Sequence, residues 1–276
     1  MALGDVTHPR RALDGNDVDA WDPDYIRRVL PLWRAVLCNY FRAEVRGLDN
    51  IPERGPALLV GNHSGGTYIA DTFIFATQFY SWFGPERRFH QLAHDMAARL
   101  PATGLSRWGT VAASHENAGK AFDKGAPVLV YPGGDWETFR PIWHSDRIEF
   151  AGRKGFIKLA LERGVPIVPV VAIGGQETAL FATRGERAAE VTGWAKLTRI
   201  KVLPVALGPP FGVTLLDLPG RIPLPSKITI EVQPPIDITT RFGPRPDHER
   251  VYEEITAQMQ ANLSELQEER ALPVVG

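Results

Sequence analysis

Short apolar segments alternate with stretches of helical spacing through the middle of the chain. Each segment is three to five residues long, which suits a buried strand and is too short for a helix. They occupy residues 57–61, 89–92, 110–112, 128–131 and 167–171. Buried strands separated by helices favour a parallel sheet with helices on both faces. We therefore expect an α/β fold with a mixed, largely parallel sheet flanked by helices.

Helix signals fill the gaps between these strands. Ser114 is a suitable N-cap for a helix over 116–124, and Gly164 is a suitable end for one over 154–163. Near the C-terminus, Asp247 caps a segment with an apolar stripe that is typical of core packing. Further elements are expected at 72–83, around 95–100, and as a late strand at 227–232.

The composition is that of an ordinary globular protein. A chain of 276 residues is long enough for one large domain. The 31 basic and 32 acidic residues nearly cancel, so no overall field attracts nucleic acid. Cys38 is the only cysteine, which excludes an intramolecular disulfide. No apolar run reaches the roughly 20 residues that a membrane-spanning helix needs.

The N-terminal region divides into a tail and a helix. Residues 1–24 are predicted to be a loose tail, 25–47 an amphipathic, membrane-interfacial helix, and 48–276 the main domain. Apolar residues at helical spacing between 25 and 41 include Trp33 and Tyr40, with arginines on or beside the other face. Such a helix can lie in the headgroup layer of a membrane. The alternative is that its stripe packs on the protein's own core.

A glycine-rich turn follows the first strand and carries the most informative residues of the chain. Asn62 and His63 come directly after the apolar run, and Gly65, Gly66 and Asp71 follow. An imidazole can act as a general base at neutral pH when a carboxylate fixes its tautomer. Glycines in such a turn let the backbone pass close to a substrate. We therefore predict His63 as a base and Asp71 as its orienting acid.

A second turn repeats this plan after the strand at 128–131. Gly133 and Gly134 are followed by Asp135 and Glu137. Two such turns in one α/β chain indicate a single site that is built from two loops. Beyond them lies a cationic group that could hold the phosphates of a carrier such as coenzyme A, or be a solvated basic surface: Arg140, Arg147, Arg153 and Lys154.

Four blocks in order resemble the glycerolipid acyltransferases, the phospholipid/glycerol acyltransferase superfamily. The first is Gly-Asn-His-Ser-Gly-Gly at 61–66 with Asp71, and the second is Trp-Gly-Thr-Val-Ala-Ala-Ser at 108–114. The third, at 131–137, is closer to the diacylglycerol acyltransferase-like branch because it contains Pro-Gly-Gly and a later Glu. The fourth is the proline-containing strand at 164–170. The similarity runs from about residue 40 to residue 171.

The resemblance implies a glycerol-3-phosphate acyltransferase-like fold and an O-acyltransferase. A fatty acyl group would move from acyl-CoA, or from an acyl carrier protein, to the hydroxyl of a glycerolipid or other lipid alcohol. His63 would be the general base, and no metal or further cofactor is implied. The enzyme would work at the cytoplasmic side of the cell membrane as a peripheral or monotopic protein. The residues expected to bind substrate are Asn62, Gly65, Gly66, Gly133, Gly134, Glu137, Arg140, Arg153 and Lys154.

Two departures from the family pattern leave alternatives open. Four residues usually separate the histidine from its aspartate, but here the interval holds seven, and position 68 is Tyr68. Asp71 or another acid such as Asp135 therefore orients His63. The third block lacks the Glu-Gly-Thr-Arg form that is associated with acceptors carrying a phosphate. A neutral lipid alcohol is thus as plausible an acceptor as lysophosphatidate.

The sequence also leaves two other functions open. Ser64 follows a strand as in an esterase elbow, so a serine esterase or lipase is the alternative enzyme, although the first elbow glycine is replaced by Asn62. A non-catalytic acyl-lipid-binding protein is the alternative from another class. His90 and His94 have zinc-protease spacing, but Gln91 stands where the glutamate base must be. The apolar, proline-broken segment 203–224 is either an irregular packed connection or a loop that lines an acyl channel or touches the bilayer.

Overall fold

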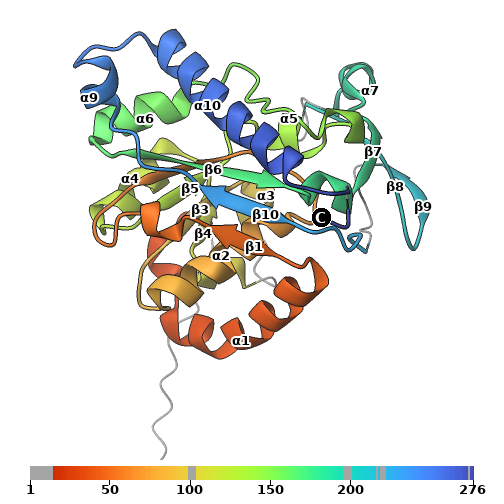
Figure 1. The fold of residues 1–276 in the computed structure, drawn as a ribbon, viewed down its shortest axis with the longest axis horizontal. Helices are drawn as coiled ribbons and strands as arrows, with labels where there is room; N and C mark the ends of the chain where they lie inside the picture. The colour runs from red at the N-terminus through yellow and green to blue at the C-terminus, as the bar shows by residue number, and fades with distance from the viewer. Residues whose placement is uncertain (1–14, 99–103, 195–200, 216, 218–221, 273) are drawn as a thin grey trace, which may run out of the picture.

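The main sheet of the computed structural model is mixed and largely parallel, as predicted (Figure 1). The structure describes residues 15–98, 104–194, 201–215, 217, 222–272 and 274–276. Seven strands pair in the order β1-β10-β6-β2-β5-β3-β4. The five from β6 to β4 run parallel, whereas β10 is antiparallel to β6 and β1 is parallel to β10. The strands are β1 (Glu44–Arg46), β2 (Leu58–Gly61), β3 (His90–Ala93), β4 (Thr110–Ala112), β5 (Val128–Val130), β6 (Ile167–Ile173) and β10 (Thr229–Val232).

Helices cover both faces of this sheet (Figure 1). Successive residues of β2 point to opposite faces, so Leu58 and Val60 join one hydrophobic cluster and Leu59 joins the other. The first cluster is completed by α4 (His115–Asp123), α6 (Gly155–Arg163), α9 (Ile238–Phe242) and α10 (His248–Glu268). The second is completed by α1 (Pro23–Tyr40) and α2 (Ala70–Phe83). The remaining helices are short: α3 (Asp95–Ala98), α5 (Gly134–Thr138) and α7 (Glu186–Val191).

The predicted helix ends are confirmed where they depend on local hydrogen bonds. The Ser114 hydroxyl accepts from the backbone N–H of Asn117, and Asp247 accepts from that of Glu249. Gly164 ends α6 in a left-handed conformation. The predicted tail lies partly outside the described residues, but residues 18–20 form a short 3-10 helix whose Val18 is buried. The helix predicted over 25–47 is too long: α1 begins at Pro23 and ends at Tyr40, and residues 44–46 form β1 because they pair with β10.

Segment 203–224 contains an element that the sequence did not predict. Its prolines flank two short strands, β8 (Val205–Gly208) and β9 (Gly212–Leu215), rather than interrupting them. These pair with β7 (Leu180–Thr183) in a separate three-stranded antiparallel sheet. Prolines at strand ends leave the ladder intact, so a proline-rich segment can still form a hairpin.

The described helices and strands also bear on a membrane span and on the pair His90 and His94. Among the helices that the structure describes, none combines the length and the apolarity needed to cross a membrane. His90, the first histidine of the pair with zinc-protease spacing, lies in the strand β3, so the pair does not have the helical geometry of a zinc-protease site. Within the described part of the chain, no group of three His, Cys, Asp or Glu side chains could hold a metal ion.

His90 makes stability depend on pH. Its ring is fully buried, Nδ1 lies 2.9 Å from the carbonyl of Gly109, and burial lowers its pKa from 6.5 to about 4. Between about pH 6.5 and 4, His90 therefore binds a proton in the unfolded chain but not in the folded one. We predict that this site removes on the order of 3 kcal/mol of unfolding free energy as pH falls from about 6.5 to 4.

Chemical denaturation of His90→Gln at several pH values tests this prediction. The variant should lose that part of the pH dependence because glutamine does not titrate. His248→Gln, at an exposed position, is the matched control and should keep the wild-type slope. A His90→Gln slope equal to that of the wild type would refute the assignment.

Candidate active site

Two loops meet at one edge of the sheet because β2 and β5 are adjacent and parallel. His63 follows β2, and Tyr131 follows β5, so both leave the carboxyl ends of neighbouring strands. The imidazole stacks on the Tyr131 ring with 4.1 Å between centroids and 15° between planes. The His63 side chain is 12% exposed, which leaves it reachable from outside. The prediction of one site built from two loops thus agrees with this geometry.

Tyr131 is a part of the site to which sequence analysis gave no role. Its hydroxyl accepts a hydrogen bond from Thr72 at 2.9 Å, at the start of α2. Burial, followed by the nearby carboxylate of Asp71, raises the pKa of this phenol well above its ordinary value. Tyr131 therefore stays neutral and fixes the plane of the His63 ring. Its position directly before Pro-Gly-Gly was the available signal.

Asp71 is the carboxylate beside the imidazole. Its Oδ2 lies 3.5 Å from Nδ1 of His63, which is ion-pair range and longer than a hydrogen bond. The side chain is 1% exposed and accepts from the backbone N–H and hydroxyl groups of both Ser64 and Thr72. These donors hold the carboxylate in place. The longer turn thus brings Asp71 to the histidine despite the unusual spacing.

The other candidate acid, Asp135, is bound elsewhere. One of its oxygens accepts from Arg153 at 2.9 Å and the other accepts from the backbone N–H of Lys201, also at 2.9 Å. The geometry therefore favours Asp71 over Asp135 as the orienting residue.

Glu137, on the loop after β5, connects this loop to the one that carries His63. Its Oε2 accepts from the backbone N–H of His63 at 2.9 Å, and its Oε1 accepts from that of Glu149 at 3.0 Å. Arg140 lies 3.3 Å from the same carboxylate and donates to the carbonyl of His63. Both charged side chains are buried. Burial raises the pKa of the Glu137 carboxyl, while Arg140 and the two amide donors favour its charged form.

This burial corrects the expected roles of two residues. Glu137 was predicted to shape an acceptor pocket and Arg140 to bind phosphates, but their side chains are 0% and 1% exposed. They hold the backbone of His63 instead of facing a substrate. Gly133 belongs to the same arrangement because a Cβ there would lie 2.4 Å from Oε2 of Glu137. Gly134 opens the short helix α5 that carries Glu137.

The remaining predicted phosphate ligands are engaged by the protein itself. Arg153 donates to the carbonyls of Pro132 and Gly133 and pairs with Asp135. Lys154 pairs with Glu249. A phosphate could bind these side chains only by displacing their partners, so the structure does not support a free cationic cradle.

The residues around His63 also have structural partners. Asn62 is fully buried, and its amide exchanges two hydrogen bonds with the backbone of Ala172, at 2.9 and 2.8 Å. Its side chain thereby extends the pairing of β2 with β6. A Cβ on Gly65 would lie 3.0–3.2 Å from oxygens of the protein, and one on Gly66 would lie 2.4 Å from the ring of Phe181. These close approaches are to the protein's own atoms rather than to an open substrate channel.

Ser64 is poorly placed to be a nucleophile. It is 2% exposed, and its hydroxyl donates to Asp71 at 3.1 Å rather than to a histidine. A hydroxyl that donates to a carboxylate behind the loop does not face a carbonyl substrate. The geometry therefore argues against the serine esterase alternative.

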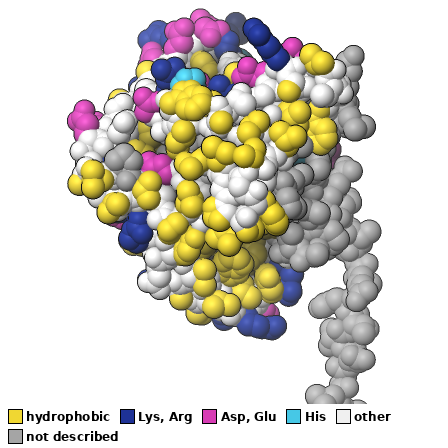
Figure 2. Space-filling view, turned by 90° about the vertical axis from the view of Figure 1, so that its right-hand side faces the viewer, with side chains coloured by type: hydrophobic (Ala, Val, Ile, Leu, Met, Phe, Trp, Pro, Cys, Tyr) yellow, Lys and Arg dark blue, Asp and Glu magenta, His cyan; other side chains and the backbone are white. Residues whose placement is uncertain are grey.

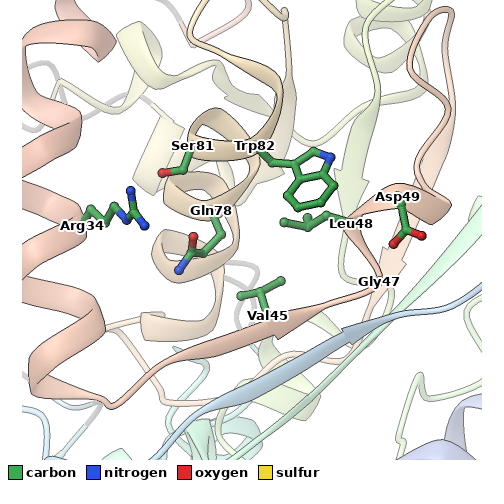
Figure 3. Close-up of a pocket in the computed structure, with 8 residues that line it drawn as sticks. All are labelled: Arg34, Val45, Gly47, Leu48, Asp49, Gln78, Ser81 and Trp82. Carbon is green, nitrogen blue, oxygen red and sulfur yellow. The ribbon is translucent and has the colours of Figure 1, made fainter.

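A pocket of about 240 Å³ lies elsewhere, between α1, α2 and the turn after β1 (Figure 3). Arg34 enters it from α1, and Gln78, Ser81 and Trp82 enter it from α2. Ser81 is ten residues beyond Asp71 on the same helix, which corresponds to about 15 Å. This pocket is therefore separate from the His63 site.

The buried Glu137–Arg140 pair yields a prediction about stability. Glu137→Gln removes the charge and leaves a buried guanidinium without its partner, which costs about 3–5 kcal/mol of unfolding free energy. Glu186→Gln is the control, because Glu186 is 46% exposed and lies 3.9 Å from Arg184. It should change the unfolding free energy by less than about 0.5 kcal/mol. Urea denaturation measures both, and equal stability of the two variants would contradict the role given to the pair.

Comparisons with known proteins agree with this fold. The family model described as Acyltransferase matches residues 42–173. An uncharacterized protein of Mycobacterium tuberculosis is 29% identical over 267 residues, which are 93% of this chain and 70% of that protein. The "DGAT1/2-independent enzyme synthesizing storage lipids" of Bos taurus is 26% identical over 152 residues, 52% of this chain and 42% of that enzyme.

A solved structure shows the same fold. The crystal structure of the 1-acyl-sn-glycerophosphate acyltransferase PlsC from Thermotoga maritima superposes with a TM-score of 0.55 at 16% sequence identity. The alignment covers 91% of this chain and 85% of that one. The matched family region contains both glycine loops, from His63 to Glu137. Residues 42–173 therefore form an acyltransferase domain like those of the phospholipid/glycerol acyltransferase superfamily, and the protein is an acyltransferase.

Proposed function

We propose that this enzyme transfers a fatty acyl group from a thioester donor, acyl-CoA or acyl carrier protein, to the hydroxyl of a lipid alcohol. The observation that supports this most is the His63 imidazole at the junction of two loops, with Nδ1 facing Asp71. Because Nδ1 faces a buried carboxylate, Nε2 is the nitrogen that meets the acceptor. The two ring nitrogens thus have separate roles: Nδ1 faces the orienting carboxylate, and Nε2 accepts the proton.

The reaction then proceeds without a covalent enzyme intermediate. Nε2 of His63 takes the proton of the acceptor hydroxyl as its oxygen attacks the thioester carbonyl. Asp71 stabilises the imidazolium that forms. The tetrahedral intermediate collapses with cleavage of the carbon–sulfur bond, and the imidazolium returns the proton to the leaving thiolate. The products are an ester and the free thiol of the carrier.

We infer that the acceptor is a neutral lipid alcohol rather than a lysophosphatidate. Arg140 is buried, and Arg153 and Lys154 have acidic partners, so these three side chains are not free to bind a phosphate. Arg147, the fourth member of the group, is 59% exposed and lies 3.9 Å from Asp146. The name of the Bos taurus relative, an enzyme synthesizing storage lipids, is in keeping with such an acceptor. Mass spectrometry of the products from one acyl-CoA and a panel of lipid alcohols, with lysophosphatidate included, tests the choice. Exclusive acylation of lysophosphatidate would reverse it.

The mechanism predicts different effects at two adjacent positions. His63→Ala should lower kcat by about 10²–10⁴-fold because the base is lost. Ser64→Ala should retain activity within about tenfold, because it removes only one of the donors to Asp71. Product formation is measured with labelled acyl-CoA, and intact-protein mass spectrometry checks for an acyl-enzyme. An inactive Ser64→Ala enzyme together with an acyl-enzyme in the wild type would establish a serine mechanism instead.

Helix α1 supplies a surface for peripheral membrane contact. Ile26 and Leu37 are buried in the core, while Leu32, Val36 and Tyr40 are 69%, 50% and 38% exposed. The exposed three follow i, i+4, i+8 spacing and so form one stripe. Such a stripe, with the arginines of the same helix, fits the interface of an anionic membrane on the cytoplasmic side.

Point variants test this contact better than deletion of the helix, which would uncover Ile26 and Leu37. Leu32→Glu combined with Val36→Glu should weaken flotation with phosphatidylglycerol-containing liposomes by about tenfold, because two charges enter an apolar contact. Val191→Glu, at an 88% exposed position on α7, is the control and should float as the wild type does. Equal flotation of all three proteins would discard α1 as a membrane contact.

A further inference from the structure

The small sheet β7–β8–β9 has one face that packs against the protein. Phe181, Ala206 and Thr214 are buried on this inner face, in register across the three strands. Phe181 lies edge-on to the ring of Phe139, 5.4 Å away, in a small hydrophobic cluster. The inner face is thus a normal protein core.

The outer face of the same sheet is also apolar. Leu180, Leu207 and Val213 form one row across the strands, because Leu180 pairs with Leu207 and Leu207 with Val213. Leu215 lies in the next row on β9, and Phe211 is at the turn of the hairpin. Their exposed fractions are 37% for Leu180, 40% for Leu207, 68% for Val213, and 58% for both Leu215 and Phe211.

This surface is unusual for a sheet that faces water. An antiparallel sheet with one solvated face normally alternates apolar and polar residues, and edge strands usually carry charge. Here residues 202–216 contain no charged residue at all. Hydrophobic side chains gather over this side of the molecule, from the level of the β8–β9 hairpin down toward α1 (Figure 2). A contiguous exposed apolar patch marks an interaction surface.

Neighbouring features identify a lipid bilayer as the occupant. Residues 222 and 223 join this surface to α1. The backbone N–H of Ile222, whose side chain is 56% exposed, donates to the carbonyl of Pro209 in the β8–β9 hairpin at 3.0 Å, and the hydroxyl of Tyr40 donates to the carbonyl of Pro223 at 2.5 Å. The exposed stripe of α1 and the outer face of the sheet therefore adjoin on one side of the protein. Arg28 and Arg34 of α1 are exposed and match anionic headgroups. The enzyme's substrates are lipids, which reside in such a bilayer.

The sheet is also attached to the catalytic loop. Its inner face meets the loop after His63, where the Phe181 ring leaves no room for a Cβ on Gly66. Asp217, two residues beyond β9, accepts from the backbone N–H of Thr67 at 3.0 Å. One layer of sheet therefore separates the outer face from the loop, and packed layers lie about 10 Å apart. A bilayer on the outer face would come that close to the acceptor's path.

We propose that the outer face of β7–β8–β9, with Phe211 at its tip, inserts into the bilayer as a second membrane contact and sets the mouth of the His63 site against it. The proposal rests on the proposed acyl transfer, since it concerns how lipid reaches that site. The contact is uncharged, so its contribution to binding should persist at high salt. The contribution of the α1 arginines should fall as salt rises.

A pair of identical substitutions tests the insertion. Val213→Glu places a charge on the outer face, and Val191→Glu places the same charge at an exposed valine of α7. We expect Val213→Glu to float at least about tenfold less with phosphatidylcholine liposomes in high salt, and Val191→Glu to float as the wild type does. With acceptor and donor dispersed in detergent micelles, Val213→Glu should keep wild-type activity, because Val213 touches no part of the site. Thermal melts verify that both variants are folded.

Each result has a distinct meaning. Equal flotation of Val213→Glu and wild type overturns the insertion. A change in oligomeric state of Val213→Glu in sedimentation without liposomes also overturns it, because a second copy of the chain would then cover the face. Loss of micellar activity in the wild type itself would instead refute the proposed acyl transfer and leave the flotation result standing. Nitroxide labels at Val213→Cys and Val191→Cys, in a Cys38→Ser background, should show lipid exposure only at position 213.

Discussion

The position of the imidazole depends on a buried charge pair. The Glu137 carboxylate holds the N–H of His63, and Arg140 holds its carbonyl, so both sides of this residue's backbone are fixed by the second loop. Both charges are buried, where each is costly without its partner. The amide of Gln176 donates to the carbonyl of Arg140 and ties in the loop after β6. The loops after β2, β5 and β6 are therefore linked by hydrogen bonds that together hold the His63 backbone in place.

This support exists because of the strand order. β6, β2 and β5 are parallel neighbours, so their carboxyl ends, and the loops that follow them, lie at the same edge. An antiparallel neighbour would have sent its next loop to the opposite edge. The two strands that reverse direction, β10 and β1, are placed at one side of the sheet, beyond β6. They complete the sheet without interrupting the three loops.

How much the sequence predicts depends on the range of the interaction. Strand positions and the caps at Ser114 and Asp247 follow from neighbouring residues, and these predictions hold. The structural role of Asn62 depends on Ala172, 110 residues away, and so could not be read from the motif. Motif residues such as Glu137 look like substrate ligands in sequence because burial is invisible there. The strands β8 and β9 escaped prediction because the prolines around them suggested an irregular segment.

A general base that activates a lipid hydroxyl would activate water equally well, and water would waste the thioester. The protein supplies part of the answer, since the His63 side chain is only 12% exposed and is stacked on Tyr131. The proposed bilayer against the neighbouring sheet would supply the rest, because the mouth of the site would then open on lipid rather than on bulk solvent. Apolar residues on the outside of β7–β8–β9 would thus serve selectivity as well as binding.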